Sequence, residues 1–131
     1  GGLGLEALSR YASHCDFIEL DKQAATQLKS NLTLVNASNT AATGVHQGDA
    51  LNILKDISDA PYDIIFVDPP FAKGLVAPTL AAIVDNNLVQ SGSVIYLEHE
   101  SALVTPLLPA HWNIIKDKQT SALRYMLIEV N

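Results

Sequence analysis

The tetrapeptide Asp68-Pro69-Pro70-Phe71 is the part of the sequence best suited to chemistry, and it directly follows the apolar run DIIFV. Each proline fixes its own φ and restricts the residue before it to extended geometry. The Asp68 carboxylate and the Pro69 carbonyl can therefore be held toward one point, where two acceptors suit the two donors of an amino group. Phe71 offers a flat face on which a base can stack. The motif predicts a site that orients an exocyclic amine.

Glycines and acidic residues upstream indicate a nucleotide-like ligand. Gly2 and Gly4 belong to a G-x-G-x-x-A pattern, in which small residues let backbone amides approach a ligand at a helix N-terminus. Glu19 ends an apolar run, where a carboxylate can accept hydrogen bonds from ribose hydroxyls. Asp21 and Asp49 are further candidates, and each is equally typical of a helix N-cap. A plain helix-entry turn is the alternative for the glycines.

Helical and strand-like patterns alternate along the whole chain, with no repeat, linker or low-complexity tract. Apolar stripes at helical spacing and short apolar runs mark the elements. The expected helices cover residues 3–12, 24–35, 51–57 and 76–84, and the expected strands cover 15–20, 44–47, 63–67, 93–97, 112–116 and 123–130. This order predicts an α/β fold: a mainly parallel open sheet, with helices on both faces and a C-terminal antiparallel hairpin.

A glycine turn such as Gly1-Gly2-Leu3-Gly4 normally follows a buried parallel strand. We therefore expect a first strand to precede residue 1. The complete sheet would have seven strands, six of which lie in this chain. Residues 1–131 are expected to form a single domain, a catalytic domain truncated at its N-terminus.

The composition excludes several other classes of protein. With 48% hydrophobic and 17% charged residues the chain is not expected to be disordered, and neither a membrane-spanning run nor a signal peptide is expected from its residues. The single cysteine, Cys15, favours a reducing cytoplasm and is expected to be a small buried hydrophobe. The four histidines lack metal-ligand spacing, so no metal site is expected. The net charge of −6, from 8 basic and 14 acidic residues, is unusual for a protein that binds a polyanion.

The segments GGLGLEALSR, FIELD, GDAL and FVDPPF resemble the bacterial RsmD family over essentially the whole chain. The resemblance implies a Rossmann-like fold that uses S-adenosylmethionine to methylate the N2 amine of a guanine in small-subunit ribosomal RNA. By resemblance, Gly2 and Gly4 flank the methionine part of the cofactor, Glu19 holds its ribose and Asp49 contacts its adenine. Asp21 and Ala50 are further candidate cofactor-binding residues.

The family resemblance also implies the remaining partners and the target site. Residues 68–71 would hold the target base, and the substrate would be ribosomal RNA or the assembling small subunit. The family's first strand and its basic N-terminal extension are absent from these 131 residues.

Three alternatives stay open at this stage. The first is a DNA methyltransferase acting on adenine N6 or cytosine N4, because similar D-P-P-aromatic motifs serve there. The second is a nicotinamide-dependent oxidoreductase, which the glycine pattern with Glu19 also fits. The third is a fragment that folds but is inactive by itself. Whether Asp68 removes a proton is also open, and no chemical role is assigned to Glu98 or His99.

Overall fold

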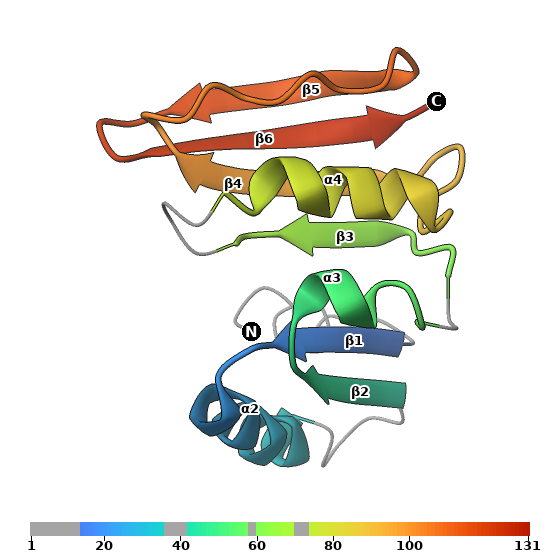
Figure 1. Ribbon diagram of the computed structural model, residues 1–131, viewed down its shortest axis with the longest axis vertical. Helices are drawn as coiled ribbons and strands as arrows, with labels where there is room; N and C mark the ends of the chain where they lie inside the picture. The colour runs from blue at the N-terminus through green and yellow to red at the C-terminus, as the bar shows by residue number, and fades with distance from the viewer. Residues whose placement is uncertain (1–13, 36–41, 58–59, 70–73) are drawn as a thin grey trace. The chain divides into compact units, whose positions relative to one another are not determined.

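A computed structural model describes residues 14–35, 42–57, 60–69 and 74–131. The chain divides into two compact units, Gly1–Asp56 and Ile57–Asn131, and each is described by itself (Figure 1). In the described residues no helix is both long and apolar enough to cross a membrane. The helix expected over residues 3–12 lies outside the described residues.

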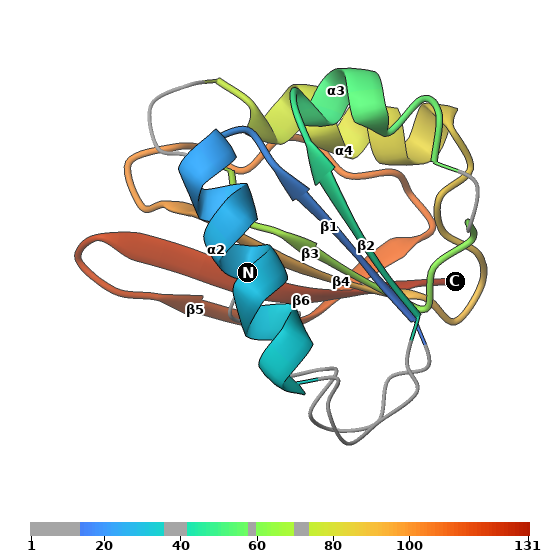
Figure 2. The same cartoon turned by 90° about the horizontal axis from the view of Figure 1, so that it is seen from below.

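The described residues of the first unit form a pair of parallel strands and two helices. Strands β1 (His14–Glu19) and β2 (Ala42–Gln47) lie side by side and point the same way, in a register that pairs Glu19 with Gln47 (Figure 2). Helix α2 (Lys22–Val35) connects them, and the short helix α3 (Ala50–Ile53) follows β2. This βαβ arrangement brings the carboxyl ends of β1 and β2 to one edge.

The apolar core of the first unit lies between α2 and the strand pair. Phe17 of β1 packs with Leu28 and Leu32 of α2, and all three are buried. The apolar spacing of Ala24, Leu28 and Leu32 predicts one buried stripe on α2, and it is wrong for Ala24, which is exposed, whereas Ala25 is buried with 3% of its surface accessible. Ala25, Leu28 and Leu32 therefore form the buried face of α2. This face is centred on Leu28 and is rotated about the helix axis by about one residue from the face that the sequence predicts.

In the part that the structure describes, the second unit is a four-stranded sheet with one helix. Its strands are β3 (Ile64–Val67), β4 (Val94–Glu100), β5 (Trp112–Gln119) and β6 (Leu123–Val130), in the order β3-β4-β6-β5. Helix α4 (Val76–Asp85) connects β3 to β4 and lies along these two strands (Figure 1). Strands β3 and β4 are parallel, whereas β6 is antiparallel to both of its neighbours.

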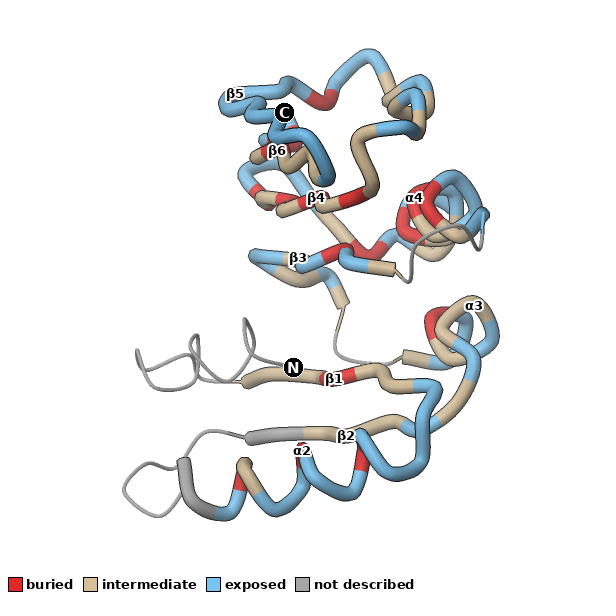
Figure 3. Tube along the Cα trace, turned by 90° about the vertical axis from the view of Figure 1, so that its left-hand side faces the viewer, coloured by how far each residue is buried: buried red, intermediate tan, exposed pale blue. Residues whose placement is uncertain are grey.

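Buried and half-buried side chains alternate along β4, so one face of this sheet is buried and the other is open. Ile95, Leu97 and His99 are each 0% exposed, and the residues between them are only half-buried (Figure 3). Met126 and Ile128 of β6 pair with Leu97 and Ile95 and are buried as well. Because side chains alternate between the faces of a strand, Tyr96, Glu98 and Tyr125 share the open face.

Helix α4 begins and ends where its sequence predicts. Pro78 lies in the first turn, where its missing N–H breaks no helical hydrogen bond. At the other end, Asn87 adopts φ 51°, and the amides of Asn87 and Leu88 donate to the carbonyls of Val84 and Ile83. These two bonds form a Schellman motif, which Asn tolerates better than most residues. The chain then returns toward β4 through Leu88, which is buried.

The expectation of one mainly parallel sheet was wrong for the described residues. Their six strands form two sheets, of two and four strands, and antiparallel pairings are as frequent as parallel ones. The reason is the C-terminal hairpin, in which β6 inserts between β4 and β5 and pairs antiparallel on both sides. The α/β class, the C-terminal hairpin and the six expected strands are confirmed in outline.

Two element boundaries differ from expectation in ways that concern the site. The helix expected over residues 51–57 is shorter, because α3 ends at Ile53. The Asp56 amide donates to the Ile53 carbonyl at 3.0 Å, a bond between residues three apart that closes a turn instead of continuing the helix. Strand β4 extends three residues past Leu97 to Glu100, so that Glu98 and His99 lie within the strand.

Ser93, just before β4, is expected to contribute strongly to stability. It is 2% exposed, its hydroxyl donates to the Tyr62 carbonyl at 2.7 Å, and it accepts from the Gln90 amide at 3.0 Å. Ser93→Ala leaves both groups without this partner, so the free energy of unfolding should fall by about 1–3 kcal/mol. Urea denaturation measures this change. Ser91→Ala, at an exposed position, is the control, and equal midpoints for the two variants would contradict the account.

Candidate functional site

The carboxyl ends of β1 and β2 gather four of the expected cofactor-binding residues. Glu19 ends β1, and its backbone carbonyl accepts from the Gly48 amide at 2.9 Å. Asp21 follows, and its backbone amide donates to Glu19 Oε1 at 3.2 Å. Asp49 comes two residues after the end of β2, with Ala50 beginning α3. The parallel pairing therefore brings Glu19, Asp21, Asp49 and Ala50 to one edge of the first unit.

Both aspartates at this edge also bond to the start of the helix that follows, as the sequence allowed. Asp21 Oδ1 accepts from the Gln23 amide at 3.0 Å, and Asp49 Oδ1 accepts from the Leu51 amide at 2.9 Å. Each bond uses one oxygen of a carboxylate that has two. The second oxygens, together with the half-buried Glu19, form a set of acceptors that suits the hydroxyls and amino group of a nucleoside. These carboxylate acceptors therefore fit the nucleoside part of the expected cofactor.

Asp68 and Pro69 lie at the carboxyl end of β3 in the second unit. The register pairs Val67 with Leu97, so the next residues along the two parallel strands, Asp68 and Glu98, are neighbours. Phe66 and Tyr96, one pair earlier on the open face, have ring centroids 6.1 Å apart. The Tyr96 hydroxyl donates to Glu98 Oε1 at 3.2 Å. The sequence predicted the position of Asp68 but gave Glu98 no role.

Burial and neighbouring charge raise the pKa values of two side chains at this edge, Asp68 and Tyr96. The Asp68 side chain keeps contact with solvent, yet the partial loss of water around it raises its pKa, and the charge and hydrogen bonding of Glu98 raise it further. Partial desolvation also raises the pKa of Tyr96, with further contributions from Glu98, Tyr125 and Asp68. A carboxyl group whose pKa is raised in this way at a strand end, as that of Asp68 is, is typical of functional sites.

The remaining expected site residues, Gly2, Gly4, Pro70 and Phe71, lie outside the described residues. Their roles stay predictions.

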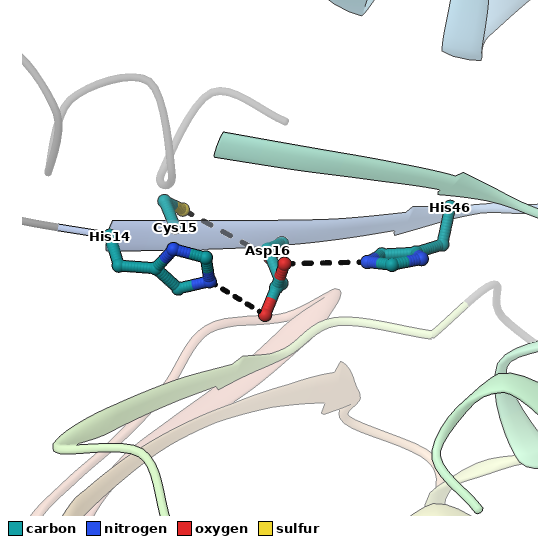
Figure 4. A network of polar contacts seen from close by, with 4 residues as sticks. All are labelled: His14, Cys15, Asp16 and His46. Atoms are coloured by element: carbon teal, nitrogen blue, oxygen red, sulfur yellow. Dashed lines mark hydrogen bonds and ion pairs between the residues drawn. The ribbon is translucent and has the colours of Figure 1, made fainter. Parts of the chain in front are cut away.

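A second polar cluster, which the sequence did not predict, lies on the β1–β2 pair (Figure 4). Asp16 has 7% of its side chain exposed and accepts hydrogen bonds from His14 Nε2 at 2.9 Å and His46 Nε2 at 3.3 Å. Gly44 permits this approach, because a Cβ there would lie 2.6 Å from Asp16 Oδ1. Among the described residues no group of three or more candidate ligands is arranged to hold a metal ion. The His46–Asp16 contact joins β2 to β1.

Cys15 occupies the apolar environment that its sequence position indicated. It packs against the cluster of Phe17, Leu28 and Leu32. Burial, with a smaller contribution from the Asp16 carboxylate, raises the pKa of the Cys15 thiol to about 11. The thiol is therefore protonated near neutral pH, which is unfavourable for a nucleophile.

Taken by themselves, the fold and these side chains define a class: an α/β protein with carboxylates at the carboxyl ends of parallel strands, where such folds bind ligands. Residues 1–129 match the family described as Conserved hypothetical protein 95, and the chain belongs to this family. The resemblance to the RsmD family drawn from the sequence is thereby confirmed.

Two curated relatives carry the same name, ribosomal RNA small subunit methyltransferase D. The Haemophilus influenzae protein is 37% identical over 98% of this chain and 66% of its own length. The Escherichia coli protein is 36% identical over 98% of this chain and 63% of its own length. The chain thus spans just under two thirds of the curated relatives it matches.

Solved structures agree with the fold. An Escherichia coli structure described as a candidate methyltransferase has a TM-score of 0.86 and 35% identity, and it covers 100% of this chain and 71% of its own. A Haemophilus influenzae structure described as a candidate methylase has a TM-score of 0.85 and 37% identity, with coverages of 99% and 80%. These likenesses are consistent with a Rossmann-like α/β fold.

The capping role of Asp49 can be separated from any role in ligand binding. Asp49→Ala removes the acceptor for the Leu51 amide and should lower the free energy of unfolding by about 1 kcal/mol. Asp49→Asn retains a capping oxygen and should leave stability close to that of the parent. Thermal or urea unfolding of the three proteins measures the difference, and an equal loss in both variants would show that the charge of Asp49, rather than its cap, is what stabilises the fold.

Proposed function

We propose that this chain carries catalytic residues of an S-adenosylmethionine-dependent methyltransferase that modifies the exocyclic N2 amine of a guanine in small-subunit ribosomal RNA. The observation that carries the proposal is the position of Asp68-Pro69 directly after a parallel strand, in a chain whose curated relatives are named ribosomal RNA small subunit methyltransferase D. The substrate would be the RNA or the assembling small subunit, met in the cytoplasm.

The acidic edge of the first unit supplies the proposed cofactor contacts. Glu19 would accept hydrogen bonds from the ribose hydroxyls, with Asp21 beside it, and Asp49 and Ala50 would lie at the adenine. Gly2 and Gly4 complete the proposed set. When bound, S-adenosylmethionine supplies a methyl group on a positively charged sulfur, which makes that methyl an electrophile.

The end of β3 supplies the proposed amine contacts. The Asp68 carboxylate and the Pro69 carbonyl would each accept one N–H of the target amine, which draws its lone pair out of conjugation with the ring. As the new N–C bond would form and the methyl–sulfur bond would break, the positive charge would pass from the sulfur to this nitrogen, where the Asp68 carboxylate would stabilise it. The nitrogen would then return to neutrality by losing a proton to Asp68 or to water. Proposed stacking on Phe71 would hold the base in the plane that these acceptors require.

In this mechanism most of the rate enhancement comes from holding the amine nitrogen in line with the methyl group. The methyl is already activated, so this alignment removes a large entropic part of the barrier. A paired guanine has to leave its stack to reach such a site, at a cost of about a few kcal/mol. The proposal therefore favours a guanine that is unpaired or distorted in the substrate.

Methyl transfer by Asp68 variants tests the proposal. We expect Asp68→Ala to lower the rate of transfer to unmethylated small-subunit RNA or particles by about 100-fold or more, by analogy with the loss of one preorganised transition-state contact. Asp63→Asn, an exposed aspartate just before the same strand, is the matched control and should keep the parent rate. The protein expressed from its complete coding sequence and the 131-residue chain are assayed in parallel.

Two results would contradict the proposal. One is an intact, folded parent protein that transfers no methyl group to any small-subunit RNA substrate. The other is an Asp68→Ala variant that retains the rate of the parent.

A further inference from the structure

Glu98 is the nearest charged neighbour that the β-sheet provides for Asp68. The parallel register ends with Val67 opposite Leu97, and one residue further along each strand come Asp68 and Glu98. Both belong to the open face, because Phe66 and Tyr96 occupy it two residues earlier, whereas Val67 and Leu97 are buried on the other face. Backbone pairing thus places two carboxylates side by side at the strand ends.

Glu98 is held in this position by its own strand and by the next one. The Tyr96 hydroxyl donates to Glu98 Oε1 at 3.2 Å. The Tyr96 ring in turn stacks on Tyr125, with centroids 6.5 Å apart and planes inclined at 26°, and it meets Phe66 on the other side. Tyr125 is also the residue that pairs with Glu98 across β4 and β6. An aromatic row across three strands therefore fixes the partner that orients Glu98.

We propose that Glu98 is a positioning residue for the target amine, acting through Asp68. Its carboxylate, oriented by Tyr96, borders one side of Asp68 and directs the acceptor oxygen of Asp68 away from Glu98, toward the incoming amine. A second negative charge beside Asp68 also strengthens the field that stabilises the cationic nitrogen. This inference rests on the proposed function, in which the ionised Asp68 is the active form.

The charges around the pair support this role. Partial desolvation raises the pKa of Asp68, and the charge and hydrogen bonding of Glu98 raise it further, so Glu98 acts directly on the Asp68 carboxyl. The groups facing the pair are Tyr96 from β4 and Tyr125 from β6, with Lys118 of β5 paired to Tyr125. By strand alternation His99 and the ion-paired Arg124 and Asp117 lie on the opposite face.

The pH profile of methyl transfer tests Glu98, using the protein expressed from its complete coding sequence. We expect Glu98→Gln to lower kcat by about 10-fold with little change in KM for RNA, a loss of alignment rather than of binding. Its acid limb should move to lower pH, because the neighbouring negative charge is gone. Glu100→Gln removes a charge from the same face of β4 and should reproduce the parent profile.

A direct titration keeps the test independent of turnover. The ¹³C resonance of the Asp68 carboxyl is followed against pH in the parent and in Glu98→Gln, and its midpoint should fall in the variant. An unchanged midpoint, or a Glu98→Gln profile that matches the parent, would overturn the role of Glu98 while leaving the proposed function intact. A parent that transfers no methyl group would instead reject the proposed function, and the titration would then still decide whether Glu98 acts on Asp68.

Discussion

The parallel register between β3 and β4 is the constraint on which the candidate amine site depends. It aligns Val67 with Leu97, and it thereby makes Asp68, just after the end of β3, a neighbour of Glu98 within β4. A slip of one residue would exchange the faces of β4, bringing Glu98 into the core and the fully buried Leu97 into solvent. The apolar residues that prevent this slip, which contact no substrate in the proposed mechanism, are therefore as necessary to the site as the carboxylates.

The same principle applies in each unit: backbone pairing of parallel strands gathers side chains that are far apart in sequence. In the first unit it brings Glu19 to the edge that Asp49 also occupies, and it brings Asp16 to His46 across 30 residues. The acceptor sets differ in character. Glu19, Asp21 and Asp49 suit neutral hydroxyl and amino donors, whereas Asp68 with Glu98 concentrates negative charge where the proposed reaction develops a positive one.

The sequence predicted the features of the fold that depend on residue type and spacing within one segment. The apolar run before Asp68, the stripe of Leu28 and Leu32 and the helix caps at Asp21 and Asp49 all follow from spacing and residue type, and the structure confirms them. It could not predict what depends on pairing between strands. The extension of β4 to Glu100 was missed because the apolar run ends at Leu97 and His99 is polar. His99 is buried nonetheless, because Nδ1 donates to the Glu100 carbonyl at 2.7 Å and Nε2 bonds with Thr105 Oγ1 at 3.0 Å. The antiparallel insertion of β6, which makes the sheet mixed, likewise has no local signal.

The central claim is that the end of β3 orients an exocyclic amine, and the identity of the methylated atom tests it most directly. Small-subunit RNA labelled by the intact protein is digested to nucleosides, and the labelled nucleoside is identified by chromatography and mass spectrometry. The account predicts a methyl group on the N2 amine of guanosine, where Asp68 and Pro69 can accept both N–H groups. A label on a ring carbon or on a ribose 2′-oxygen would contradict it, because neither atom presents two donors to these acceptors.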